Sequence, residues 1–308
     1  MQRPILITGS PRSGTTWVGS IVGRASQVGW IREEPFSPDH RPGVCDARFE
    51  LWFTYINANN GTEYQHSFER MLSFQYATTA QIRETRSIAS MRLLLEDVVR
   101  FRSYRRRGLR PMFKDPLAIF SVEWLAQTLN VQPVILIRHP AAFVSSLKRL
   151  DWHYDFGDFE RQPDLVQSYL HPFREELTEY ARNPPCDVVD EGILVWRLIY
   201  NTVTQYQERH HDWLFVRHED LSLDPVRGFE RLFDYLGLQF SDEISATIAD
   251  YTGSHNPMEA PPDCLHFLKR DSKANVDNWR HRLTPLEIER VHRGVSNIAQ
   301  RYYVDTDW

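Results

Sequence analysis

The chain has 308 residues, of which 42% are hydrophobic and 25% are charged, and its formal net charge at pH 7 is −5. This length allows a large core, and the composition is that of an ordinary soluble protein. The mild negative charge excludes general nucleic-acid binding, so any basic patch must be local. No stretch approaches the roughly 20 apolar residues that a membrane-spanning helix needs.

The cysteines and the first residues bear on the cellular compartment. Cys45, Cys186 and Cys264 lie far apart and show neither metal-ligand spacing nor a disulfide framework, which fits a reducing environment. Residues 1–4 lead directly into a short apolar run, without the pattern of a signal peptide. We therefore expect a cytoplasmic protein without a metal site, and we leave open an anchor upstream of residue 1.

Five short β-branched runs predict buried parallel strands. They are Ile5–Thr8, Val28–Arg32, Met112–Lys114, Val134–Arg138 and Trp213–Arg217. Turns or helix-like patterns follow them, for example at residues 14–23, 141–150 and 225–237. This alternation predicts an α/β fold with a central parallel sheet covered by helices on both faces. Ligands bind such sheets at the carboxyl ends of the strands, so the residues just past each strand are the candidate site.

Two insertions interrupt the alternation. The first, at about 45–110, is mostly helical in pattern and rich in arginine and aromatic residues, and the second, at 151–191, begins "DWHYDFGDFE" and contains four prolines. Long segments outside a sheet usually cover or shape a site. We expect one domain over residues 1–308, with both insertions shaping its substrate cleft.

The segment "ILITGSPRSGTTW", residues 5–17, has the outline of a phosphate-binding loop. Gly9 and Gly14 allow the backbone to turn tightly after the first strand. The amides of residues 13–16 can then point at one anion at a helix N-terminus.

The charged groups of this loop differ from those of a nucleoside-triphosphate site. Thr15 occupies the position where such a loop carries lysine. Arg12 supplies a fixed cation with a fork of donors, and the fourth strand ends in Arg138 rather than a metal-binding aspartate. Arginines without an obvious metal ligand suit a group that is less heavily charged than a triphosphate, such as a sulfuryl donor.

Three motifs resemble those of sulfotransferases that use 3′-phosphoadenosine 5′-phosphosulfate (PAPS). "GSPRSGTTW", residues 9–17, closely resembles the family's 5′-phosphosulfate loop. "LIRHPAAFVSSLKR" resembles its 3′-phosphate motif, with Arg138 at a strand end and Ser146 eight residues later. "SKANVDNWR" is similar to a C-terminal loop in which a lysine, here Lys273, helps to hold the 3′-phosphate. The resemblance covers nearly the whole chain and implies a three-layer fold like that of P-loop NTPases.

The resemblance implies a role for each residue of the donor site. Arg12 would face the bridging oxygen and the sulfuryl group. Trp17 would lie under the adenine, although the sequence without the resemblance favours a core residue at this position. The other residues implied to bind PAPS are Ser13, Gly14, Thr15, Thr16, Arg138, Ser146, Lys273 and Asn275. Lys269 and Arg270, next to the C-terminal loop, are alternatives for the phosphate.

The catalytic residues are less clearly marked. The family places a lysine after the third strand, here Lys114, which would contact the bridging oxygen or the sulfate; its alternative partner is Asp115. The histidine that serves as base in cytosolic relatives is missing, because the chain continues Lys-Asp-Pro. Glu34 after the second strand is the best base candidate, since some relatives place a glutamate in a comparable segment and a carboxylate there can accept the acceptor's proton. The other candidates are Glu33, His40 and His153.

These observations predict a PAPS-dependent sulfotransferase that acts on a hydroxyl and releases adenosine 3′,5′-bisphosphate. The acceptor would be a carbohydrate, a lipid-linked molecule or a secondary metabolite; an anionic or carrier-linked acceptor would suit the arginine run at 104–110, which is otherwise a solvated face. The runner-up is a nucleotide or small-molecule kinase with a degenerate loop, and a third reading is a non-catalytic nucleotide-binding protein of the same fold. The oligomeric state is left open.

Overall fold

The computed structural model describes residues 2–185, 187–259 and 267–308, so Cys186 and Cys264 lie outside the described residues. The chain divides into two compact units. The first consists of Met1–Thr8 and Val18–Val134, and the second of Gly9–Trp17 and Ile135–Trp308. That both belong to one domain stays a prediction.

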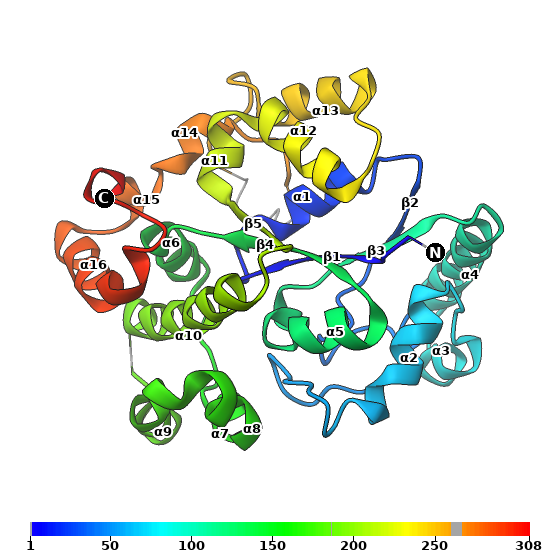
Figure 1. The fold of residues 1–308 in the computed structure, drawn as a ribbon, viewed down its shortest axis with the longest axis horizontal. Helices are drawn as coiled ribbons and strands as arrows, with labels where there is room; N and C mark the ends of the chain where they lie inside the picture. The colour runs from blue at the N-terminus through cyan, green and yellow to red at the C-terminus, as the bar shows by residue number, and fades with distance from the viewer. Residues whose placement is uncertain (1, 186, 260–266) are drawn as a thin grey trace. The chain divides into compact units, whose positions relative to one another are not determined.

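The first unit contains three parallel strands in the order β2-β3-β1. They are β1 (Ile5–Gly9, of which the last residue belongs to the second unit), β2 (Val28–Ile31) and β3 (Arg110–Lys114). The helices are α1 (Thr15–Val22, which begins in the second unit), α2 (Thr62–Leu72), α3 (Thr78–Glu84), α4 (Ile88–Arg106), the 3₁₀ helix η1 (Pro116–Ser121) and α5 (Val122–Leu129). Figure 1 shows α1 and α5 on opposite faces of β1 and β3. Phe68 of α2 packs among Phe36, Phe113 and Trp124 in the core of this unit.

The second unit contains the neighbouring strands β4 (Gln132–Ile137, which begins in the first unit) and β5 (Leu214–Arg217). Between them lie α6 (Pro140–Leu150), α7 (Gly157–Glu160), α8 (Pro163–Leu165), the π-helix η2 (Val166–Leu170), the 3₁₀ helix η3 (His171–Phe173), α9 (Arg174–Arg182) and α10 (Val188–Arg209). After β5 follow α11 (His218–Leu223), α12 (Pro225–Leu236), α13 (Asp242–Thr252), α14 (Ser272–Val276), α15 (Trp279–Arg282), α16 (Pro285–Ala299) and η4 (Asp305–Asp307). The long helix α10 packs against α6 and α16 because its apolar residues are almost all buried.

The predicted fold class is confirmed, since five strands form one sheet and helices connect them. Each strand lies within two residues of its predicted bounds. The first insertion is largely helical, as its pattern predicted, and the second contains the short helices α7, α8 and α9. Within the described ranges, no helix has both the length and the apolar character that crossing a membrane demands.

Candidate active site

Two glycines shape the loop between β1 and α1. Gly9 has a φ of +149° and Gly14 one of +92°, values that favour glycine. A Cβ on Gly9 would lie 2.5 Å from the carbonyl oxygen of Leu136, and one on Gly14 would lie 2.8 Å from Nδ1 of His218. The loop therefore approaches the end of β4 and the start of α11 more closely than any side chain would allow.

Tyr200 of α10 holds the same loop through hydrogen bonds. Its hydroxyl lies 2.9 Å from Oγ of Ser10 and accepts a hydrogen bond of 2.9 Å from the backbone N–H of Arg138. The Ser13 hydroxyl donates to the Ser10 carbonyl at 2.6 Å. Ser13 is fully buried, and its backbone N–H also donates to the Ser10 carbonyl, at 3.1 Å, so both groups stabilise the loop. Ser13, which the sequence predicted to bind the donor, is not among the residues that line the pocket described next. Tyr200 thus connects the loop to Arg138, the residue directly after β4.

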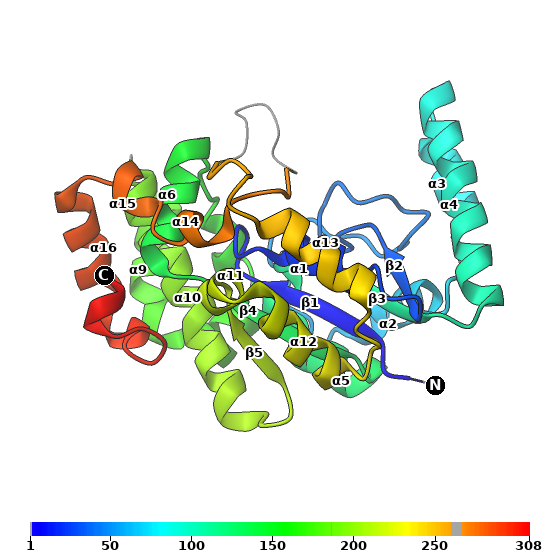
Figure 2. The same ribbon diagram turned by 90° about the horizontal axis from the view of Figure 1, so that it is seen from above.

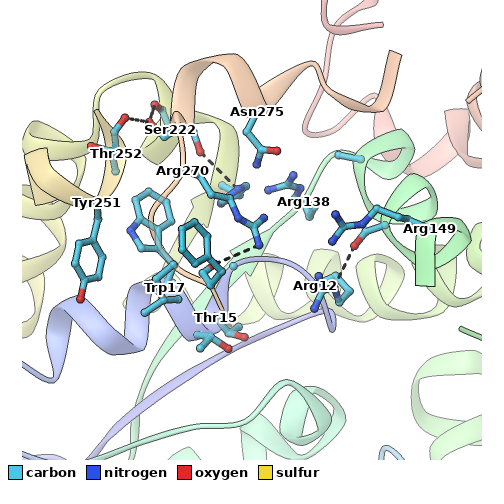
Figure 3. Close-up of a pocket in the computed structure, with 18 of the residues that line it drawn as sticks. Arg12, Thr15, Trp17, Arg138, Arg149, Ser222, Tyr251, Thr252, Arg270 and Asn275 are labelled. Carbon is cyan, nitrogen blue, oxygen red and sulfur yellow. Dashed lines mark hydrogen bonds between the residues drawn. The ribbon is translucent and has the colours of Figure 1, made fainter. Parts of the chain in front are cut away.

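Five arginines line one pocket of the second unit, and no acidic side chain is among the described residues that line it. They are Arg12, Arg138, Arg149, Arg270 and Arg282. Figure 3 shows Arg12, Arg138, Arg149 and Arg270 converging, with Trp17 and Tyr251 to one side of them. Gly14, Thr15, Thr16, Ser146 and Asn275 also line this pocket. Most of the predicted donor-binding residues are therefore brought together by the fold.

The arginines perturb one another because they are crowded and partly withdrawn from water. Burial, and then the charges of Arg149 and Arg138, lower the pKa of Arg12 below its usual value. Burial, followed by the charges of Arg12 and Arg138, lowers the pKa of Arg270 to about 10. An anion in this pocket would relieve both effects, because it stabilises the charged guanidinium. The pocket is therefore electrostatically suited to a ligand with several negative charges.

Nearby carboxylates offset part of this charge. The Arg138 Nε lies 3.7 Å from Oε1 of Glu219. The Arg282 Nε donates to Oε1 of Glu259 at 3.0 Å, and Arg149 lies 3.5 Å from the same carboxylate. Two acids against five arginines leave a positive excess.

Arg12 and Ser146 meet directly, although 134 positions separate them in the chain. The Arg12 Nε donates a hydrogen bond of 3.0 Å to the Ser146 hydroxyl, drawn as a dashed line in Figure 3. Arg12 itself has a φ of +66°, an uncommon conformation for a residue other than glycine. The first and second motifs thus form one continuous surface.

Trp17 takes part in both the pocket and the core. Its ring lines the pocket and packs edge-to-face against Phe229 of α12, at 5.1 Å between centroids, and against His218, at 5.6 Å. Trp17 thus packs in the core, as the sequence without the resemblance favoured, and contact with the adenine stays a prediction. Tyr251 and Phe267 add further aromatic surface to the pocket lining.

The C-terminal loop presents a different cation from the one that the motif favoured. Lys273 is exposed on α14 and is not among the lining residues, whereas Arg270, three positions earlier, lines the pocket. Asn275 lines it as predicted. Arg270 is thus the better placed of the basic residues that the sequence left open here.

The two predicted catalytic residues of the first unit form an ion pair with each other, Lys114 Nζ to Glu34 Oε1. Burial lowers the pKa of Lys114. The alternative partner, Asp115, is instead fully buried and accepts hydrogen bonds from the amides of Phe36 at 2.7 Å and Leu117 at 2.9 Å. The sequence singled out both Glu34 and Lys114 but did not show that they contact each other, and their catalytic roles stay predictions.

Each of the other base candidates has its own partners. Glu33 forms an ion pair with Arg41. The ring nitrogens of His40 lie 2.6 Å and 2.8 Å from the carbonyl oxygens of Ser37 and Cys45. The Nδ1 atom of His153 lies 2.8 Å from Oε1 of Glu191, and this hydrogen bond is the main cause of a raised pKa.

Comparison with known proteins decides the family. The family model described as "Sulfotransferase family" matches residues 4–242. The chain belongs to the sulfotransferase family. The match begins just before β1 and ends within the first residues of α13, so it includes the loop, Glu34, Lys114 and the Arg138 motif of this sulfotransferase family member.

Individual relatives are distant. Flavonol 3-sulfotransferase from Flaveria bidentis is 23% identical over 163 residues, which are 44% of this chain and 51% of that protein. The match therefore spans about half the length of this curated relative. Among solved structures, the sulfotransferase domain from the curacin biosynthetic pathway is 15% identical, with coverage of 96% of this chain and 98% of that chain and a TM-score of 0.48. A mouse sulfotransferase complexed with PAP is 13% identical, with coverage of 100% and 87% and a TM-score of 0.48.

Sequence reasoning missed two arginines of this family member's pocket, Arg149 and Arg282, and the tyrosine that holds the neighbouring loop, Tyr200. Arg149 lies three residues after Ser146 on α6, and this helical spacing could have revealed it. Tyr200 and Arg282 come from distant parts of the chain, and no local pattern marks them. Only the packing of α10 and α15 brings them to the end of β4.

Proposed function

We propose that this protein transfers the sulfuryl group of PAPS to an acceptor hydroxyl and releases adenosine 3′,5′-bisphosphate. The observation that carries the proposal is the convergence of five arginines beside a lysine-free glycine loop. PAPS carries a phosphate on its 3′-oxygen and a phosphosulfate on its 5′-oxygen, so it offers anions to more than one of these guanidinium groups. Family membership supports the same reaction.

The pocket suggests how the donor would lie. The amides of the loop and the hydroxyls of Thr15 and Thr16 would hold the 5′-phosphate at the start of α1. Arg138, together with Arg270, would take the 3′-phosphate. The aromatic side of the pocket, with Trp17, would receive the adenine. This orientation places Arg12, with its hydrogen bond to Ser146, at the phosphosulfate.

The reaction breaks the bond between sulfur and the bridging oxygen and forms one between sulfur and the acceptor oxygen. Negative charge then grows on the leaving 5′-phosphate, where Arg12 would stabilise it. The transition state is expected to be loose, so positioning and charge stabilisation would contribute most of the catalysis, as in phosphoryl transfer. The acceptor hydroxyl's proton would pass to Glu34.

The ion pair between Glu34 and Lys114 suggests how the base is prepared. As the resemblance implies, Lys114 would contact the bridging oxygen or the sulfate of the donor. Lys114 would then leave the carboxylate, and Glu34 would become free to accept a proton. Donor binding would in this way activate the base, because the Glu34 carboxylate would no longer be paired with Lys114 when the acceptor binds.

Titration calorimetry with adenosine 3′,5′-bisphosphate, AMP and ADP tests the donor site. We expect the bisphosphate to bind most tightly, because only it carries the 3′-phosphate. Tight ADP or ATP binding that requires Mg²⁺ would instead indicate a kinase. Transfer of labelled sulfate from PAPS to members of an acceptor panel tests catalysis, and bisphosphate binding without transfer to any acceptor would favour the non-catalytic reading.

The acceptor stays a prediction: a carbohydrate, a lipid-linked molecule or a secondary metabolite, reached through a cleft shaped by the two insertions. In the second insertion, Phe156 and Phe159 are buried, so they support packing rather than stacking on a ligand. Trp152 is half-buried and stacks on Tyr154, at 6.3 Å between centroids. Of this aromatic stretch, Trp152 is therefore the best placed to meet a sugar or an aromatic ring. The cytoplasmic location also stays a prediction.

A further inference from the structure

Helix α4 of the first unit carries a row of exposed aliphatic side chains. Ile88, Met91, Leu95 and Val99 follow one another at intervals of three or four residues, which places them on one face of the helix. Ile88 is 90% exposed and Val99 is 66% exposed. The side of the helix that packs into the unit carries Leu94, Asp97 and Phe101.

This concentration is unusual within the described residues. Eleven large hydrophobic side chains are exposed there, and six of them lie between Ile82 and Val99. These six all belong to α3 or α4, which lie side by side in Figures 1 and 2 and which we call, with residues 78–107, the α3–α4 hairpin. Single exposed apolar residues need no explanation, whereas a contiguous group points to an interaction site.

The same hairpin is strongly basic, although the whole chain is acidic. Its exposed charged residues are Arg83, Glu84, Arg86, Arg92, Glu96, Arg102, Arg105, Arg106 and Arg107. Seven arginines thus stand against two glutamates, and Glu96 is already paired with Arg92 at 2.9 Å. Four of the arginines gather at the C-terminal end of α4, directly beyond the aliphatic row.

We propose that the α3–α4 hairpin docks on an anionic membrane surface, with the aliphatic row in the interface and the arginines on lipid phosphates. A helix that combines exposed aliphatic residues with clustered arginines is typical of peripheral membrane attachment. Each arginine near an anionic surface strengthens binding roughly fivefold. The proposal concerns the first unit alone and does not depend on the donor reaction.

Charge and side-chain type argue against the other occupants. A second copy would bring seven arginines against the same seven, which repel. If the hairpin bound in a groove of a partner protein, we would expect it to expose aromatic side chains, since Trp and Tyr dominate such contacts. The exposed large hydrophobic side chains of the hairpin are instead all aliphatic or Met. A bilayer accepts aliphatic side chains without a shaped groove.

Vesicle flotation with the full chain tests the proposal. We expect the protein to float with vesicles of phosphatidylcholine and phosphatidylglycerol but not with phosphatidylcholine alone. Raising the salt to about 1 M should release much of it, because the Debye length then shrinks to about 3 Å. A protein that stays at the bottom with the anionic vesicles would overturn the proposal.

Matched variants distinguish vesicle binding by the hairpin from non-specific binding by exposed aliphatic residues elsewhere. Leu95→Ser with Val99→Ser should weaken binding to the anionic vesicles at least about tenfold. The control, Leu286→Ser with Val304→Ser, removes aliphatic side chains that are 78% and 65% exposed outside the hairpin, and should bind like wild type. Circular dichroism would confirm that both variants fold.

A charge variant tests the second half of the surface. Arg105→Gln with Arg106→Gln should lose more than tenfold on anionic vesicles and show a smaller salt effect. Equal binding by all variants would overturn the assignment to the hairpin. A second result would also overturn it: the protein forms a dimer in light scattering, Leu95→Ser with Val99→Ser abolishes that dimer, and vesicles do not bind the protein. That result would assign this face of the hairpin to a second copy of the chain.

Discussion

Replacing Arg138 by alanine should weaken the binding of adenosine 3′,5′-bisphosphate about 100-fold. The Arg138 side chain is only 11% exposed and lines the pocket, so its guanidinium would meet a phosphate away from bulk water. A hydrogen bond to a charged group is worth about 1.5–3 kcal/mol, and breaking a buried charge pair costs about 3–5 kcal/mol. A loss of about 3 kcal/mol corresponds to this 100-fold rise in Kd.

The cost to folding should be smaller. The carboxylate of Glu219 would lose Arg138, which lies 3.7 Å away, but would keep two donors. These are the backbone N–H of His139 at 3.0 Å and the hydroxyl of Tyr303 at 3.0 Å. Because the carboxylate stays hydrogen-bonded, we expect Arg138→Ala to lower the free energy of unfolding by only about 1 kcal/mol.

The assay is titration calorimetry with the bisphosphate and with AMP, which lacks the 3′-phosphate. Arg138→Ala should bind AMP almost as wild type does, so that the loss is specific to the bisphosphate. Arg227→Ala, which removes an exposed arginine of α12 outside the pocket, is the control and should change neither affinity. An equal loss for both ligands, or no loss for either, would refute the assignment of the 3′-phosphate to Arg138.

The remaining predictions concern the base, the loop and pH. Glu34→Gln should lower sulfate transfer at least about 100-fold while bisphosphate affinity changes little, and unchanged transfer from labelled PAPS would remove Glu34 as the base. Gly14→Ala should lower the free energy of unfolding by about 1–2 kcal/mol and weaken bisphosphate binding, since its φ is +92° and the new Cβ would meet the ring of His218. The control is Gly237→Ala, at a φ of +64° with open space around it, which should lower stability through backbone strain without changing bisphosphate binding. If Gly14→Ala bound the bisphosphate as tightly as wild type, the close approach of the loop to His218 would be contradicted. Burial, opposed by Glu219, lowers the pKa of His139 to about 4 in the folded protein. The unfolded chain keeps the usual pKa of about 6.5, so between these two values the unfolded state binds more protons than the folded state. The contribution of His139 to stability is therefore complete above about pH 6.5 and is lost as the pH falls toward 4. Thermal unfolding should therefore show wild type losing more stability between pH 7 and pH 4 than His139→Phe, which keeps the stacking on Trp279, and identical pH profiles would count against a neutral buried imidazole.

The strands and the phosphate loop were predictable because they depend on neighbouring residues. A run such as Ile5–Thr8 is apolar enough to be buried on both faces, and this alone predicts an internal parallel strand. Gly9 and Gly14 mark a backbone that other residues rarely adopt. The spacing of Arg138 and Ser146 reflects a strand end followed by two turns of helix, which is also local geometry.

The contacts between distant residues were not predictable in the same way. The sequence singled out Glu34 and Lys114 separately, and only the parallel pairing of β2 with β3 in the first unit shows that their side chains meet. In the C-terminal loop, spacing to a tryptophan favoured Lys273. In the structure, Lys273 is exposed on α14, whereas Arg270, in the segment before that helix, lines the pocket.

The sequence by itself determined the order of the five strands along the chain and the lysine-free loop, and it predicted the chemical type of the ligand, because these follow from local backbone preferences and from the charges present. The tertiary structure decided how many cations share one pocket, since Arg12, Arg149 and Arg282 come from three separate segments. It also decided which candidates were already committed elsewhere, as with Asp115. The physical reason is that electrostatic energy depends on distance and burial, and neither quantity is written in the order of the residues.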